Sequence, residues 1–357
     1  MPGFRHYKRL RWLYLALAVL EVLVIELPGV RDYALSPYAG YELGAESSND
    51  FNSDFLIPRI IERVRPGSPA ERAGFRPGDL TLSVAGIPYE DQKRIIELGR
   101  PGIGETRSIA VQRGGERLLL QLTYESNPGS YDLKYSGFAV IAFAFLIAGT
   151  ICFWFYPGPT TSLLFWLGFT GAFVFMHKPY LNSFPARSAF AMMRWFITSL
   201  WLALLLHFLL IFPKPKRILA SWPLLARFSL YLPCLLLFLI IAYFTAFPSR
   251  LTGGGEFVLN IAFIFIAAYL VLAVGAFIHT YLTMLKSERT RGMKIMAFGT
   301  AIGILPIAVS IVMLILAPRI KLPLRDYYIL TLVLVPVCFA IGVLERLSDG
   351  QQRPATS

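Results

Sequence analysis

Long apolar runs dominate this sequence and limit what it can fold into. The first, from Trp12 to Leu27, is interrupted only by Glu21 and Glu26, and Pro28-Gly29 is expected to break it. Seven further runs follow at about 137–156, 160–177, 190–212, 224–247, 256–285, 293–317 and 325–345. A helix of about 20 apolar residues crosses ~30 Å of hydrocarbon. With 55% hydrophobic and only 16% charged residues, the chain is expected to be a membrane protein with eight spans.

Basic residues near the ends of these runs predict the orientation. The positive-inside rule places the N-terminus, with its basic residues at 5–11, in the cytoplasm. Basic clusters around 214–227 and 286–294 then also fall inside, whereas the one around 319–325 falls outside, against the rule. A cleaved signal peptide is the rival interpretation of the first run. Both interpretations export the segment that follows it.

Between the first and second runs, the segment from Val64 to Pro88 has the turn and capping residues of a small soluble domain. Arg65-Pro66-Gly67 is a predicted turn, Ser68 can cap a short helix with Pro69 in its first position, and Gly74 can end it. Ala73 is expected to be packed in this helix. A strand is expected at 80–84. Further strands are expected at 60–64, 108–112 and 118–122, and a helix at 91–98. The strands 108–112 and 118–122 are expected to form a hairpin around Gly114-Gly115.

The block from Pro66 to Asp79, followed by Leu82-Ser-Val-Ala-Gly86, resembles the core signature of PDZ domains. The resemblance covers about residues 38–125. It implies a small β-rich α+β module joined to an all-α transmembrane bundle. PDZ domains bind peptide C-termini by adding a strand to a sheet edge and by capturing the carboxylate on backbone N–H groups.

The same resemblance implies the binding residues. Tyr38-Ala39-Gly40-Tyr41 is similar to the carboxylate loop of a PDZ domain, with Gly40 turning N–H groups toward the anion. The alternative is a simple juxtamembrane loop. The residues predicted to contact the peptide are Ala39, Gly40, Tyr41, Glu42 and Leu43 on the loop and its strand, with Gln92, Ile95 and Ile96 on the helix. Residues 46–54 are expected to form a loop.

Polar residues inside membrane helices are costly and are candidate sites. His207 can be a ligand or proton site, or a packing residue whose ring N–H meets a carbonyl. His279 and Arg194 lie near helix ends, where packing or snorkelling explains them. Glu21 could pair with one of these cations.

Motifs for catalysis are missing from the sequence. It has no His-Glu-x-x-His, no Gly-x-Ser-x-Gly and no phosphate-binding Gly-x-x-x-x-Gly-Lys. Its cysteines, Cys152, Cys234 and Cys338, are far apart in apolar runs, so neither a disulfide framework nor a metal site is indicated. We attribute the net charge of +12 to basic residues at the ends of the membrane spans and not to nucleic-acid binding. We therefore expect no enzymatic activity and no cofactor.

A second resemblance concerns the whole architecture. One span, an exported PDZ module and seven more spans, with His207-Phe-Leu-Leu-Ile-Phe-Pro213 ending a middle helix, is similar to the sensor half of ComP-type quorum-sensing histidine kinases. The chain stops soon after its last run, so the kinase part is absent and kinase activity is not implied.

These observations predict a bacterial inner-membrane sensor. Its extracytoplasmic PDZ domain would bind peptide or protein C-termini, and its bundle would relay to a cytoplasmic kinase or response regulator; the chain could form a homodimer. A non-catalytic adaptor that tethers substrates for a membrane protease is the alternative, and an enzyme or transporter with a polar site between helices is a third. The expected divisions are 1–30 (N-terminus and first span), 38–125 (PDZ domain), 126–136 (linker), 137–345 (seven-helix bundle) and 346–357 (disordered cytoplasmic tail).

Overall fold

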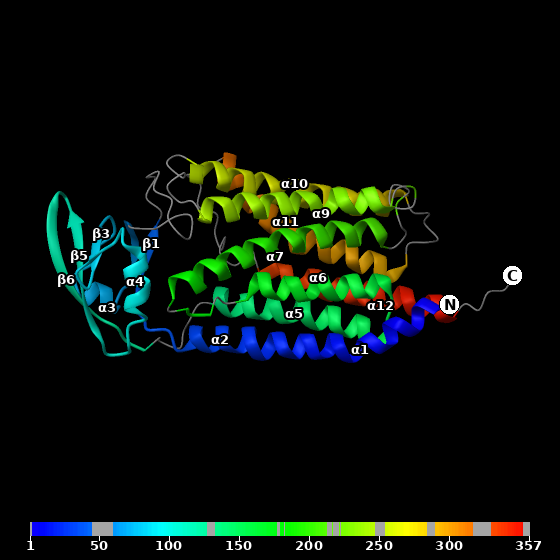
Figure 1. The fold of residues 1–357 in the computed structure, drawn as a ribbon, viewed down its shortest axis with the longest axis horizontal. Coiled ribbons are helices and arrows are strands. Elements are labelled where there is room, and N and C mark those ends of the chain that lie inside the picture. The colour runs from blue at the N-terminus through cyan, green and yellow to red at the C-terminus, as the bar shows by residue number, and fades with distance from the viewer. Residues whose placement is uncertain are drawn as a thin grey trace.

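A computed structural model shows a long helical bundle with a small β-rich module at one end (Figure 1). It describes residues 2–44, 60–126, 133–176, 179–181, 183–212, 216, 221, 223–246, 254–283, 290–316 and 330–352. The predicted loop at 46–54 lies outside these residues. Where the chain enters α1 and leaves α12, it is at the end of the bundle opposite the module.

The module contains one antiparallel sheet with strand order β1-β2-β3-β5-β6, and β4 pairs with β3. Every strand and helix predicted from the sequence of this module is present within a few residues of its expected bounds. The strands are β1 (Tyr41–Gly44), β2 (Ile60–Val64), β3 (Leu80–Val84), β4 (Ile87–Pro88), β5 (Thr106–Arg113) and β6 (Glu116–Thr123), and the helices are α3 (Pro69–Arg72) and α4 (Gln92–Leu98).

Local sequence explains these boundaries. The Ser68 hydroxyl accepts a hydrogen bond from the Glu71 N–H at 3.2 Å, which caps α3, and Pro69 occupies its first turn. The β5–β6 hairpin closes through Gly114 and Gly115, both at positive φ, between the paired residues Arg113 and Glu116. Two consecutive residues at positive φ are typical of the two-residue turn that joins the strands of a hairpin.

An ion pair with a buried carboxylate joins the end of β5 to the residue that precedes β3. Arg113 on β5 donates to both carboxylate oxygens of Asp79, each at 2.7 Å, and the Asp79 side chain is 1% exposed. Burial alone would raise the pKa of Asp79. The hydrogen bonds from Arg113 and from the Arg76 N–H, with the charges of both arginines, outweigh it and hold the pKa below its ordinary value.

The first helix corrects a prediction. Pro28-Gly29 was expected to break it, but α1 (Pro2–Glu21), a π-helical segment η1 (Val22–Glu26) and α2 (Leu27–Ala34) follow one another without interruption. Proline has no N–H and normally breaks a helix, yet local π geometry can absorb the disturbance. The Leu27 N–H bonds to the Val22 carbonyl, five residues back. The helix therefore passes the expected boundary at residue 30.

The bundle has a helix at each of the other predicted spans. They are α5 (Leu133–Phe155), α6 (Pro159–Phe175), α7 (Phe184–Ile211), α9 (Pro223–Ala246), α10 (Gly254–Thr283), α11 (Arg291–Leu316) and α12 (Leu334–Gln352). Within the described ranges, six helices are long and apolar enough to cross a membrane, and α6 is shorter. The six segments are Tyr7–Asp32, Gly137–Phe155, Phe184–Ile211, Pro223–Phe244, Ile261–Thr283 and Leu330–Ser348. These helices fit a membrane protein, and the count of eight spans stays a prediction.

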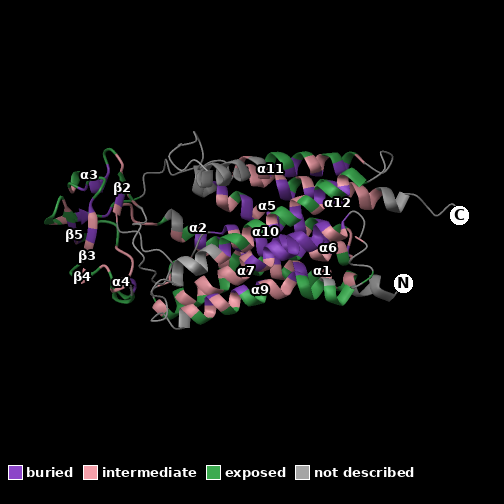
Figure 2. Ribbon diagram, turned by 90° about the horizontal axis from the view of Figure 1, so that it is seen from above, coloured by how far each residue is buried: buried purple, intermediate pink, exposed green. Residues whose placement is uncertain are grey.

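Glycines allow α5 and α6 to pack closely. A Cβ atom on Gly168 of α6 would lie 2.3 Å from the Phe145 carbonyl oxygen, and one on Gly149 of α5 would lie 2.8 Å from the Leu164 carbonyl oxygen. Small residues let backbones approach in this way inside membranes. Figure 2 shows α6 largely buried at the centre, whereas the peripheral α9 and α11 carry exposed residues.

The last helix differs from its expected bounds. The run 325–345 predicted a helix there and a disordered tail after it, but α12 begins at Leu334, after a short 3₁₀ turn at 330–333, and continues to Gln352. Extending an existing helix needs no new nucleation, so polar residues can continue it. Residues 353–357 lie outside the described residues.

Candidate functional site

The predicted carboxylate loop adopts a conformation that requires glycine. Gly40 has φ +83°, and a Cβ atom there would lie 2.1 Å from the Cβ of Ser68. The loop is held at its start by two backbone hydrogen bonds between Tyr38 and Glu125, at 2.8 and 3.1 Å. Both φ and lack of space therefore exclude a side chain at this position.

Ala39 and Gly40 use their carbonyls, but not their N–H groups, in hydrogen bonds with other described residues. The Ala39 carbonyl accepts from the Ala70 N–H at 2.9 Å, and the Gly40 carbonyl accepts from the Arg65 N–H at 2.8 Å. Among the residues that the structure describes, the N–H groups of Ala39 and Gly40 have no protein acceptor. Adjacent unengaged N–H groups at a turn are suited to binding an anion.

β1 is an edge strand. It stands at the end of the strand order and, among the described strands, pairs only with β2, with Tyr41 opposite Val64. Carbonyls alternate in direction along a strand. Because the Gly40 carbonyl faces β2, the N–H and carbonyl of Tyr41 face the free edge. An extended peptide can pair with such an edge.

The side chains of β1 have other partners. Tyr41 points into the module, stacks on Phe75 at 5.6 Å between ring centroids, and has its pKa raised by burial and by the neighbouring Tyr124. Leu43 packs against the same core. The Glu42 carboxylate lies 3.1 Å from Arg65 and 3.9 Å from Arg63 in an exposed pair. The backbone of β1 is therefore the part available to a peptide.

The predicted helix residues lie on α4. Asp91 caps α4 by accepting from the Arg94 N–H at 3.2 Å. Ile95 is partly buried and Ile96 is 5% exposed, and Gln92 is the first residue of the helix. Figure 1 shows β1 and α4 both on the side of the module that faces the bundle. A direct peptide contact with these residues stays a prediction.

Sequence reasoning missed a contact between the module and the bundle. The Arg100 guanidinium, just after α4, donates to the Asp32 carbonyl of α2 and lies 5.4 Å from the centre of the Tyr180 ring. The Asp32 carboxylate in turn accepts from the Tyr180 N–H at 3.0 Å. We call Arg100, Asp32 and Tyr180 the docking cluster. The sequence carries no signal for it, because its members come from three distant segments.

The polar residues of the bundle are separated. Nδ1 of His207 lies 2.8 Å from the Tyr231 hydroxyl, so its partner is a side chain and not the expected carbonyl. Nδ1 of His279 lies 2.6 Å from Nζ of Lys216. Arg194 donates to the Val174 carbonyl at 3.1 Å, in the last turn of α6.

Glu21 is the clearest departure from expectation. It was expected to pair with one of these cations, but it is 2% exposed and, within the described part of the chain, neither carboxylate oxygen has a hydrogen-bond partner. Glu26 is 1% exposed and has no partner in that part either. The candidate partners Arg194, His207 and His279 contact other residues instead. In the described part of the chain, no group of three or more metal-ligating side chains occurs.

Comparison with known proteins concerns the module. The PDZ domain family matches residues 60–113. The HhoA protein of Synechocystis sp., named as a serine protease, is 34% identical over 110 residues, 26% of this chain and 27% of that protein. The regulator of sigma-E protease RseP of Escherichia coli is 34% identical over 74 residues, 21% of this chain and 16% of that protein.

A solved structure of an HtrA-type protease with a decapeptide has 22% identity and a TM-score of 0.21, covering 29% of this chain and 34% of that one. The matched part of this chain spans about a quarter or less of the length of the relatives HhoA and RseP. These relatives are proteases or protease-related, and neither of the two is a histidine kinase. The small module is a PDZ domain, related to those of proteases and joined to a bundle of apolar helices.

Proposed function

We propose that this protein is a membrane adaptor whose PDZ domain holds the C-terminal end of a protein or peptide for a membrane protease. One observation carries the proposal. The free edge of β1 directly follows a turn at Gly40 whose N–H groups have no protein acceptor among the described residues.

The two features serve different parts of a ligand. An extended peptide would add a strand to β1, using the outward N–H and carbonyl of Tyr41. The terminal carboxylate would accept hydrogen bonds from the Ala39 and Gly40 N–H groups, and bonds to a charged acceptor contribute about 1.5–3 kcal/mol each. A peptide without a free C-terminus would lose this second part.

The protease connection rests on the relatives, and the non-catalytic role rests on the sequence. Similar PDZ domains belong to proteins named as proteases or as a protease regulator. The sequence of this chain has neither a His-Glu-x-x-His nor a Gly-x-Ser-x-Gly motif. We therefore assign capture to this protein and cleavage to a partner. The PDZ domain would act outside the cytoplasm at a bacterial inner membrane, with both termini inside.

The test is peptide binding to the full-length protein in lipid nanodiscs. A library of random C-terminal peptides should yield ligands, and amidation of each selected peptide should weaken binding at least tenfold, about 1.4 kcal/mol. Ligands that bind equally well after amidation would contradict capture of a free C-terminus. A folded protein that selects no ligand would do the same.

A pair of variants on α4 tests where the peptide lies. Ile95→Asp should weaken the selected peptides at least tenfold, because an unpaired carboxylate would face the ligand. Leu98→Asp is the matched control, since Leu98 is 38% exposed at the end of the same helix. Equal effects of the two substitutions would remove α4 from the binding site.

A sensor that relays peptide binding to a cytoplasmic kinase or response regulator is the second candidate. The docking cluster favours it, because a module fixed to the first helix and to the segment before α7 can pass a movement to the bundle. Crosslinking in cells separates the two candidates. A protease captured with the PDZ domain supports the adaptor, and a kinase or response regulator captured at the opposite end supports the sensor.

A further inference from the structure

The first helix buries two carboxyl groups in the bundle. Glu21 and Glu26 are 2% and 1% exposed, and none of their four carboxylate oxygens has a hydrogen-bond partner among the residues that the structure describes. Two ionised carboxylates in such surroundings would be strongly unfavourable. Their charge must therefore be removed or compensated.

The helix geometry brings the two groups to one face. The buried stripe of this helix contains Tyr14, Ala18 and Glu21, at spacings of four and three residues, and then Glu26 after a spacing of five. In a regular α-helix a step of five residues turns a side chain about 140° away from the starting direction. The π-helical segment η1 accommodates the extra residue and returns Glu26 to the buried face.

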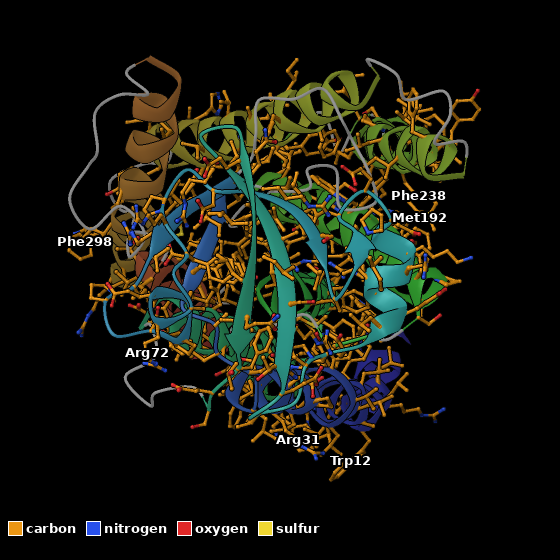
Figure 3. All side chains as sticks on the ribbon, turned by 90° about the vertical axis from the view of Figure 1, so that its left-hand side faces the viewer. Trp12, Arg31, Arg72, Met192, Phe238 and Phe298 are labelled. Atoms are coloured by element: carbon orange, nitrogen blue, oxygen red, sulfur yellow. The ribbon has the colours of Figure 1, made fainter. Side chains whose placement is uncertain are left out.

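The opposite face of the helix points away from the bundle. Trp12 and Arg31 project outward at the edge of the bundle in Figure 3. Leu23 and Val24, between the two carboxyl groups in sequence, are 57% and 60% exposed. The carboxyl groups are therefore turned toward α5 and α6, the helices packed against α1.

No cation of the described residues compensates them. α6 (Pro159–Phe175) contains no ionisable side chain, and the described side chains of α5 (137–155) include only Cys152, whose thiol lies 3.8 Å from the Ala340 carbonyl. Arg11, toward the other end of the first helix, donates to the Phe155 carbonyl. Arg31 is exposed on the outer face.

The remaining ionisable groups near the first helix also have other partners. Asp32 is bound by the Tyr180 N–H, and the Tyr14 hydroxyl lies 2.9 Å from Ser162. A metal ion would need more ligands than two carboxyl groups, and the described residues offer no group of three. A bound proton is the remaining way to remove the charge.

We propose that Glu21 and Glu26 form a proton-binding site inside the membrane, which holds at least one proton at neutral pH. Like charges on one buried face disfavour each other, so the pair retains a proton where an exposed carboxyl group is ionised. The site lies on the helix that continues through α2 to the docking cluster, and Glu26 precedes Asp32 of that cluster by six residues.

Infrared spectroscopy of the full-length protein in lipid tests this site. At pH 7, the difference spectrum between wild type and the double variant Glu21→Gln/Glu26→Gln should contain the C=O band of a protonated carboxylic acid. The matched control is Glu62→Gln/Glu97→Gln, because both residues are exposed on the PDZ domain. Its difference spectrum should contain carboxylate bands only.

The single variants provide a test that does not depend on folding of the double variant. Glu21→Gln should leave the acid band of Glu26, and Glu26→Gln should leave that of Glu21, because either group alone is still buried without a cation. Glutamine has nearly the volume of protonated glutamate, so the melting temperature should change little. If the Glu21 and Glu26 variants remove only carboxylate bands at pH 7, the proposal is wrong.

Discussion

At the scale of single residues, the buried Asp79–Arg113 pair makes the PDZ domain sensitive to acid. The pKa of Asp79 is lower in the folded protein than in the unfolded chain. Its contribution to stability is therefore complete above the unfolded pKa of about 4 and is lost as the pH falls through the depressed folded value.

Hydrogen exchange of the full-length protein measures this contribution. Asp79→Asn should lower the free energy of unfolding at pH 7 by about 2 kcal/mol, roughly a 30-fold fall in the protection factors of β3 and β5. The wild type should lose the same protection below about pH 4, and the variant should not. Glu62→Gln on the surface is the control. Similar acid sensitivity in Asp79→Asn would show that other carboxyl groups are responsible.

Gly40 is a second residue with a definite expectation. Gly40→Ala should destabilise the PDZ domain by at least about 2 kcal/mol, through strain at positive φ and the clash with the Cβ of Ser68. Ser68→Gly removes that Cβ at a small cost as a helix cap, so the double variant should recover part of the lost protection. Additive effects of the two substitutions would contradict the clash. Any residue larger than glycine here tests folding as well as binding.

Some single-residue features of the PDZ domain were predictable from the sequence and others were not. Ser68 and Gly114 were identified because caps and tight turns are decided by a few adjacent residues. Ala73 was expected to lie in the packed helix, but it is only partly buried, and Ala70 is the residue with 0% exposure. Which face of a four-residue helix is buried depends on its neighbours in space, and the local sequence does not contain them.

At the scale of helices, the contact between α5 and α6 depends on glycine. Gly168→Val should separate the two helices, since its Cβ would overlap the Phe145 carbonyl. Gly275→Val on α10 is the matched control, because no atom lies within 4 Å of a Cβ placed there. Thermal unfolding in detergent should show a clearly lower melting temperature for Gly168→Val only. Equal melting temperatures would contradict this packing.

The first helix was the element least predictable from sequence. A proline-glycine pair normally ends a helix, and here Pro28 follows a π-helical segment instead. The positions of the apolar runs were predictable, because length and hydropathy are properties of a single segment. The burial of Glu21 and Glu26 was not, because it depends on which face of the helix meets α5 and α6.

At the scale of the whole molecule, the docking cluster fixes the PDZ domain to the bundle. Arg100→Ala removes the hydrogen bond to Asp32 and the contact with Tyr180. We expect a broader distribution of distances between spin labels on β6 and on α9, with the PDZ domain still folded. Arg94→Ala, in an exposed surface pair, is the control. An unchanged distribution would mean that other contacts hold the domain in place.

The membrane orientation is a second expectation at this scale. The PDZ domain lies at one end of the bundle and the outer ends of α1 and α12 lie at the other (Figure 1). A reporter fused after Asn127 should be active outside the cytoplasm, and one fused after Gln352 should be active inside. Reporters active on the same side would exclude the eight-span topology.

The unbroken first helix has a mechanical consequence. From Pro2 to Ala34 it is about 50 Å long at 1.5 Å per residue, well beyond the hydrocarbon thickness. It is thus one long rigid helix, and Asp32 near its C-terminal end contacts the PDZ domain. The extra residue in η1 sets the rotation of α2 about the helix axis relative to α1, since each residue added to a helix turns everything beyond it by about 100°. A switch of η1 to regular α-helix would therefore rotate Glu26 and the PDZ domain about the helix axis relative to Glu21.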